Sequence, residues 1–95
     1  MTEIEPTVEA VEDLELLILT HSLPVNTRER VRRSLSTLER FPRSGRELDE
    51  PWRPVRVLLG PWPWLLMLYV YEEKDDTVLL LGFQDARSYQ AVTAH

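Results

Sequence analysis

Arginine is the residue type in this sequence that is best suited to chemistry with another macromolecule. It supplies ten of the eleven basic residues, and nine of the ten lie between residues 24 and 56, where there are five acidic residues. The guanidinium group makes forked hydrogen bonds to carboxylate or phosphate and stacks on rings. This basic middle predicts contact with an anionic partner through Arg43, Arg46 and Arg53, together with the neighbouring Trp52. The alternative is that the arginines solvate a helix face and pair with local glutamates.

Other kinds of site have few residues to build on. There is no cysteine, which excludes disulfides, thiolate catalysis and cysteine-ligated zinc and fits a reducing cytoplasm. The histidines are His21 and the terminal His95, so we expect no metal site, no catalytic triad and no cofactor. The length predicts one domain over residues 1–95. We expect no signal peptide and no membrane contact, because every apolar run is far shorter than the ~20 residues of a membrane span.

A predicted sheet between residues 55 and 83 has to position these side chains. Three apolar runs, at 55–59, 64–71 and 77–82, are separated first by a proline-containing turn and then by the charged run 72–76. A charged run of this length suits a hairpin loop, and proline is confined to strand ends and edges. We therefore predict an antiparallel meander. The run 64–71 carries no charge, which predicts a central strand covered on both faces.

Two helices are predicted before this sheet, after a short strand at residues 3–5. Thr7 is a candidate N-cap for a first helix that ends before Pro24, and the leucines of its second half require cover from the sheet or from a partner. Asn26, with Glu29 three positions later, predicts the capped start of a second helix that continues to about Arg40. The fold class is therefore α+β, an N-terminal helical hairpin packed on a small antiparallel sheet.

The order of these elements and several short motifs resemble the RelE/ParE superfamily of toxins from bacterial type II toxin–antitoxin modules. The similarity spans roughly residues 3–89. Its matching pieces are Glu-Ala and Asp-Leu in the first helix, F-P-R-S-G-R-E-L at 41–48, R-P-V-R-V at 53–57, L-Y-V-Y at 68–71 and F-Q-D-A-R at 83–87. The resemblance implies the same α+β fold and a cognate antitoxin protein as partner.

The resemblance also implies one of two activities. RelE-type members resemble small ribonucleases that cleave messenger RNA in the ribosome, whereas ParE-type members bind and poison DNA gyrase. The basic and aromatic positions of the nuclease fall here on Arg53, Arg56, Arg87 and Tyr89.

Two positions depart from the nuclease pattern, because Leu66 stands where arginine is common and Gln84 where histidine is common. One preorganised donor in such a site contributes about 3–4 kcal/mol of transition-state stabilisation. We therefore favour gyrase binding. The alternatives are ribosome-dependent cleavage of messenger RNA and a non-toxic relative that retains only antitoxin binding, and the assembly is either a homodimer or a toxin–antitoxin hetero-oligomer.

Each of these residues also has a purely structural interpretation. Arg53 and Arg56 lie beside valines, as residues of a solvated sheet face do, and Tyr89 suits a packing role. Trp62 and Trp64 could form a binding platform, since tryptophan is favoured at interfaces. Trp64 begins the apolar run 64–71, which favours a core position for that residue.

Overall fold

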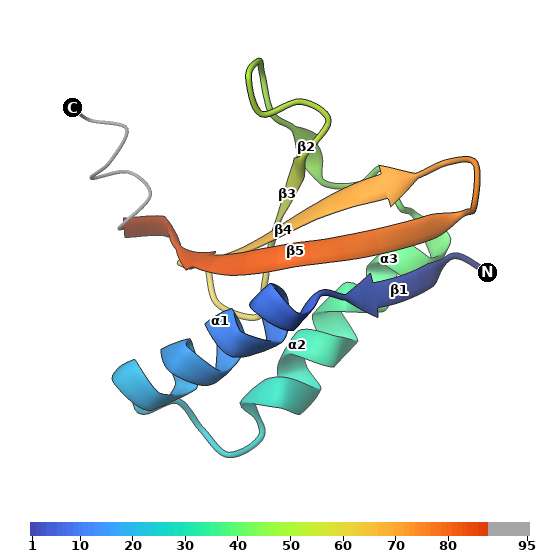
Figure 1. The fold of residues 1–95 in the computed structure, drawn as a ribbon. Helices are drawn as coiled ribbons and strands as arrows, with labels where there is room; N and C mark the ends of the chain where they lie inside the picture. Colours follow the sequence, from blue (N-terminus) through green and yellow to red (C-terminus); the bar gives the residue numbers. More distant parts are fainter. Residues whose placement is uncertain (88–95) are drawn as a thin grey trace.

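The computed structural model describes residues 1–87 (Figure 1). The elements, in chain order, are β1 (Glu3–Pro6), α1 (Val8–Thr20), α2 (Thr27–Leu35), α3 (Thr37–Arg40), β2 (Arg46–Glu47), β3 (Arg56–Leu59), β4 (Leu65–Glu72) and β5 (Thr77–Asp85). The predicted meander is confirmed as β3, β4 and β5. Its boundaries agree to within one residue except at the end of β5, which runs on to Asp85.

The five strands form one sheet in the order β1-β5-β4-β3-β2. The prediction of an antiparallel sheet is wrong at one edge, because β1 runs parallel to β5, with Glu3 opposite Thr77 and Pro6 opposite Leu80. The sequence pattern indicated a strand at the N-terminus but not its partner. A second difference is β2, which lies in a stretch predicted to be a loop and pairs antiparallel with β3.

The helices lie on one side of this sheet, with α1 packed mainly on β5 (Figure 1). The predicted cap of α1 is confirmed, since Thr7 Oγ1 accepts a hydrogen bond from the Ala10 N–H at 3.1 Å. Leu16 and Leu19 remain exposed on this helix. No helix within residues 1–87 has the length and apolarity that crossing a membrane requires.

The second predicted helix has the predicted limits, with Asn26 as its N-cap residue and Arg40 as its last residue, but its capping bond and its continuity differ. Asn26 makes no side-chain capping bond, and the hydroxyl of Thr27 instead donates to the carbonyl of Pro24 at 2.6 Å. The helix is also interrupted at Ser36, whose hydroxyl donates to the carbonyl of Arg33 at 2.6 Å. Serine competes for backbone groups in this way and weakens a helix interior. The predicted helical hairpin is not confirmed. A groove of about 820 Å³ separates α1 from α2, so the two helices do not pack closely along their length.

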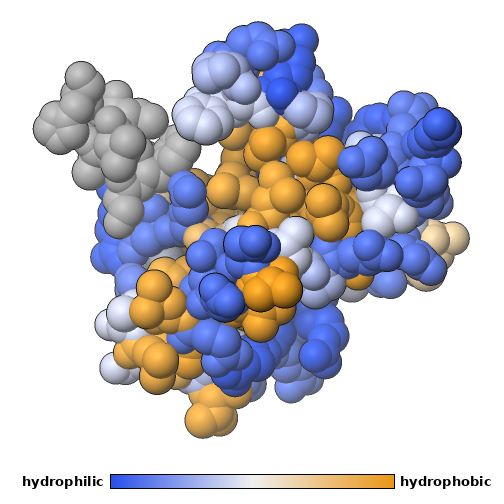
Figure 2. Space-filling view, viewed as in Figure 1, coloured by the Kyte–Doolittle hydropathy of each residue, from blue (hydrophilic) through white to orange (hydrophobic). Residues whose placement is uncertain are grey.

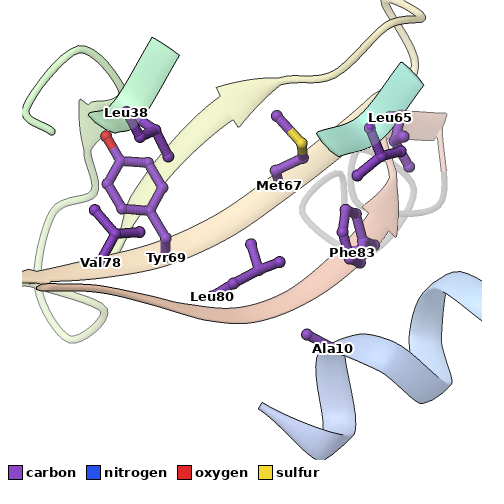
Figure 3. Packing of buried hydrophobic residues seen from close by; sticks show 9 residues of the cluster. Ala10, Leu38, Leu65, Met67, Tyr69, Val78, Leu80 and Phe83 are labelled. Carbon is purple, nitrogen blue, oxygen red and sulfur yellow. The ribbon is translucent and has the colours of Figure 1, made fainter. Parts of the chain in front are cut away.

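The core lies between the helices and one face of the sheet (Figure 3). The sheet contributes alternate residues of β4 and residues of β5 whose alternation shifts at an irregularity in the strand pairing, and each helix contributes one buried apolar side chain. The members are Leu65, Met67 and Tyr69 of β4, Val78, Leu80 and Phe83 of β5, and Ala10, Val31 and Leu38 of the helices. The prediction that β4 is covered on both faces is met only in part, since the helices cover this face and, on the other face, Leu66 is buried but Leu68 and Val70 are only half-buried.

Candidate functional site

The other face of the sheet is apolar and carries no helix in residues 1–87. Because side chains alternate between the faces of a sheet, the neighbours of the core residues point to this side. We call the surface formed by Val57, Leu59, Leu66, Leu68, Val70 and Leu79 the open face. None of the six belongs to the core cluster or packs against it. Figure 2 shows an apolar hollow here, between the hydrophilic loop that follows β2 and the hydrophilic β4–β5 hairpin.

The two edges of the open face carry opposite charges. On the β2 edge, Arg46 pairs with Val57 and therefore shares its face. On the β1 edge, Glu3 and Glu5 flank Ile4, which packs against the core, so the two carboxylates point to the open side. This arrangement makes one edge of an apolar surface basic and the other acidic.

Arg43 lies at the end of β4 and is held by the β4–β5 hairpin. Its guanidinium makes an ion pair with Glu73 at 2.9 Å and stands over the ring of Tyr71 at 5.0 Å. The Tyr71 hydroxyl donates to Asp76 at 2.8 Å, and this bond is the largest cause that raises the pKa of Tyr71. The side chain of Arg43 remains half-exposed, so it is accessible to a partner while holding the hairpin.

Arg53 and Arg56 differ in what they contact. Arg53 lies 3.8 Å from the carboxylate of Glu47 and is exposed, and the adjacent Trp52 is 63% exposed, as predicted for a contact residue. Arg56 pairs with Tyr69 on the helix-covered side of the sheet. Its guanidinium donates to the carbonyls of Arg43 at 3.2 Å and Gly45 at 2.8 Å. Arg56 is therefore turned away from the open face and holds a loop in place.

Arg87 belongs to a polar cluster at the opposite end of β4, where it contacts Asp85 twice, at 2.8 and 3.1 Å. The side chain of Asp85 is only 10% exposed, and its second partner is His21, with Nε2 3.0 Å from Oδ2. The hydrogen bond from Arg87 is the largest cause that holds the pKa of Asp85 far below its ordinary value. Tyr89, the other predicted member of this group, lies outside the described residues.

Rings and cations stack beside this cluster. The His21 ring lies 5.1 Å from Trp64 and nearly parallel to it, and Trp62 stacks on Trp64 at 5.7 Å. Arg87 stands over Trp64 at 5.7 Å, and Arg30 over Trp62 at 5.6 Å. Both tryptophans pack against the core. They therefore form a layer that joins the end of α1 to the start of β4, rather than a free binding platform.

The predicted basic residues do not converge on one point. Arg43 contacts Tyr71 and Arg87 contacts Trp64. Tyr71 follows Trp64 by seven positions along an extended segment, which corresponds to about 23 Å at roughly 3.3 Å per residue. Arg56 is on the opposite side of the sheet from the open face. A transferring phosphate needs several donors around one point, and the predicted arginines within residues 1–87 do not supply them together.

Sequence reasoning missed the role of His21. A lone histidine at the end of a predicted helix was a signal that His21 has a specific role. Its partner could not be identified, because Asp85 is 64 residues away in the sequence. Such pairing depends on the register that brings the end of β5 to the end of α1. Within residues 1–87, no group of three or more histidines and carboxylates is placed to hold a metal ion.

Neither a protein-family model nor a curated protein matches this sequence. Solved structures do match. A metal-bound toxin from Helicobacter pylori has a TM-score of 0.68 at 17% identity, covering 93% of this chain and 98% of that chain. The toxin–antitoxin complex RelBE2 from Mycobacterium tuberculosis gives 0.66 at 22% identity, covering 88% and 96%. The chromosomal ParDE system from Pseudomonas aeruginosa gives 0.67 at 12% identity, covering 90% and 96%.

These matches establish the fold, a mixed α+β arrangement shared with toxins of the RelE/ParE superfamily. RelE-type and ParE-type structures match this chain about equally well. The fold therefore does not separate the two types that the sequence resemblance implies.

Proposed function

We propose that this chain is the toxin of a bacterial type II toxin–antitoxin module, a member of the RelE/ParE superfamily that a cognate antitoxin neutralises in the cytoplasm. The support is the shared fold, together with the sequence motifs of residues 41–48 and 53–57, which fall on the α3–β2 loop and the start of β3. Toxin–antitoxin complexes such as RelBE2 are among the solved structures of this fold.

The proposed mode of action is ParE-like, in which the toxin binds DNA gyrase and inhibits it without covalent chemistry. The observation that supports this choice is the apolar character of the open face, where Leu66 occupies the position at which RelE-type toxins commonly carry arginine. An apolar surface of this kind suits a protein partner. Its centre, on β3 and β4, carries no cation of the kind that a transferring phosphate requires.

The contacts proposed for the antitoxin or the target are the exposed residues at the β2 end of the sheet. Trp52 is a large, exposed ring, and tryptophan and arginine are over-represented among residues that contribute most to binding. Arg43, Arg46 and Arg53 surround it in the sequence and remain accessible. An acidic segment of a partner would meet these guanidinium groups.

A second candidate function is the RelE-like ribonuclease, and the cluster around Asp85 is the observation that favours it. An imidazole held by a carboxylate beside a guanidinium provides a proton-transfer group and a cation at one place. Arg87 and Tyr89 would then supply charge stabilisation and a proton, without Arg56, whose guanidinium holds the loop at Gly45.

Induced expression in a bacterial host separates these proposals. A gyrase inhibitor should cause filamentation and the SOS response, and the purified protein should block supercoiling by gyrase. A ribonuclease should instead stop translation and leave cut messages. If Arg87→Ala and Tyr89→Ala abolish arrest while Arg33→Ala does not, the ribonuclease replaces the gyrase inhibitor. Normal growth at full expression would rule out both toxic activities and support the alternative of a non-toxic relative that only binds the antitoxin.

Neutralisation is tested in the same host. We expect a small reading frame beside the gene to encode a protein that restores growth when co-expressed and that co-purifies with this chain. Trp52→Ala should weaken that complex, whereas Leu19→Ala, at an exposed residue on α1, serves as the matched control. The toxin–antitoxin assignment fails if no neighbouring protein binds the chain.

A further inference from the structure

The open face is an apolar surface without a partner in the described chain. Four of its residues are half-buried, Leu66 is buried, and Leu59 is 55% exposed. Leu66 is 9% exposed although it lies outside the core cluster. The surface is therefore recessed, in agreement with the hollow in Figure 2. A recessed apolar surface fits a convex apolar element of another molecule.

The opposite charges at the two edges of the open face would orient a charged partner across the strands. Arg46 lies on β2 and the carboxylates of Glu3 and Glu5 lie on β1, which are the first and last strands of the sheet. Five strands at roughly 4.8 Å spacing place these edges about 19 Å apart. A helix of about 13 residues, at 1.5 Å per residue, covers that distance.

We infer that the open face is the effector surface of the protein and takes an amphipathic helix of the target protein, laid across the strands. The helix would place an apolar stripe on Leu59, Leu66 and Leu68, acidic side chains at Arg46, and basic side chains at Glu3 and Glu5. This inference rests on the proposed function for the identity of the target as a protein that the toxin inhibits.

Three other occupants fit the surface less well. An extended strand adds to a free sheet edge rather than to a face. A nucleic acid requires cations or exposed stacking rings at the centre of its site, where this face has aliphatic side chains. A second copy of the same face would set one hollow against another.

The test uses a synthetic helical peptide of about 16 residues, with leucine and isoleucine on one face, glutamates at its N-terminal end and lysines at its C-terminal end. Methyl chemical shifts of the isotope-labelled full chain report where it binds. We expect shifts at Val57, Leu66, Leu68 and Leu79. Shifts at Val31 and Leu35, which line the groove between α1 and α2, would overturn the inference, as would the absence of binding.

A matched pair of variants separates this surface from general hydrophobicity. Leu59→Lys on the open face should weaken peptide binding by roughly tenfold or more, because it places a charge against the apolar stripe. Leu16→Lys on α1, where the native side chain is 61% exposed, should leave binding unchanged. Arg46→Glu should weaken binding about 2- to 5-fold, as for an exposed ion pair. Equal weakening by both lysine variants would contradict the inference.

Growth arrest distinguishes failure of the inference from failure of the proposed function. A chain that binds the peptide on the open face but does not arrest growth overturns the toxin assignment alone. A chain that arrests growth equally well with Leu59→Lys overturns the open face as the effector surface. Self-association that Leu59→Lys abolishes would assign the face to a second copy and would also overturn the inference.

Discussion

The hydroxyl oxygen of Tyr69 accepts a hydrogen bond from the backbone N–H of Gly45 at 2.8 Å. Tyr69 is fully buried on β4, and Gly45 is buried in the loop before β2. Arg56 donates to the carbonyl of the same glycine from β3. Both backbone groups of Gly45 are therefore paired by side chains of the sheet, which fixes the loop that begins the Arg43–Arg56 segment.

Gly45→Ala should destabilise the protein by about 1–3 kcal/mol, the usual cost of overpacking. A Cβ at this position would lie 2.6 Å from Tyr69 Oη and 2.9 Å from the carbonyl oxygen of Val57. Urea unfolding followed by circular dichroism measures the change. Tyr69→Phe should cost about 1–3 kcal/mol by itself, because it leaves the Gly45 N–H unpaired.

The double variant tests whether the two residues act on each other. Removing the Tyr69 oxygen relieves part of the clash made by an alanine at position 45, so the combined loss should be smaller than the sum of the single losses. Additive losses would mean that the contact with Tyr69 is not what makes an alanine at position 45 destabilising.

Arg56 and Arg53 should respond differently to the same substitution. Arg56→Ala removes two hydrogen bonds to carbonyls and should lower the free energy of unfolding by about 1–3 kcal/mol. Arg53→Ala removes a half-exposed contact at 3.8 Å and should stay within about 0.5 kcal/mol. Thermal unfolding of the two variants side by side measures the difference. Similar losses would show that Arg56 is not a structural residue.

Asp85 should make the stability of the protein fall in acid. Its contact with Arg87 is the largest cause that lowers its folded-state pKa below the ordinary 3.8. The ionised carboxylate therefore contributes stability above pH 3.8, and that contribution is lost as pH falls toward the folded-state pKa. Asp85→Asn should make stability less dependent on pH below 3.8. Arg87→Ala should do so in part, and an unchanged acid dependence in both variants would contradict this assignment.

The stacking of His21 on Trp64 should be separable from the contact of His21 with Asp85. His21→Ala removes both and should lower stability by at least the roughly 0.5–1.5 kcal/mol of an aromatic pair. His21→Phe retains a ring for Trp64 and should recover the stacking part. Thermal unfolding and tryptophan fluorescence measure the two effects. Equal destabilisation by alanine and phenylalanine would show that stacking contributes nothing.

The regular parts of the fold were predictable from local pattern. The uncharged run of β4, the charged hairpin and the Thr7 cap each depend on residues close in sequence, and all three agree with the structure. The break at Ser36 and the free side chain of Asn26 were not predictable, because serine and asparagine suit several local roles and the surroundings select one.

The candidate site was predictable in composition but not in arrangement. Trp52 and Arg53 are exposed, as expected from their polar loop. The direction of Arg56 follows from its register opposite Tyr69, which local sequence does not determine. The open face was not predicted, although the apolar run 64–71 predicted β4 itself. A continuous apolar run indicates that both faces of a strand are covered, but it does not indicate what covers each face.

The pairing of β1 with β5 constrains the synthesis of this protein. Residues 3–6 are synthesised long before the strand that pairs with them, which begins at Thr77. A nascent chain shorter than this cannot complete the sheet, and the core contributed by Val78, Leu80 and Phe83 is then missing as well. The folded molecule therefore forms only after nearly all of the described chain has been translated, so a chain cut short within β5 lacks both its parallel strand pair and part of its core.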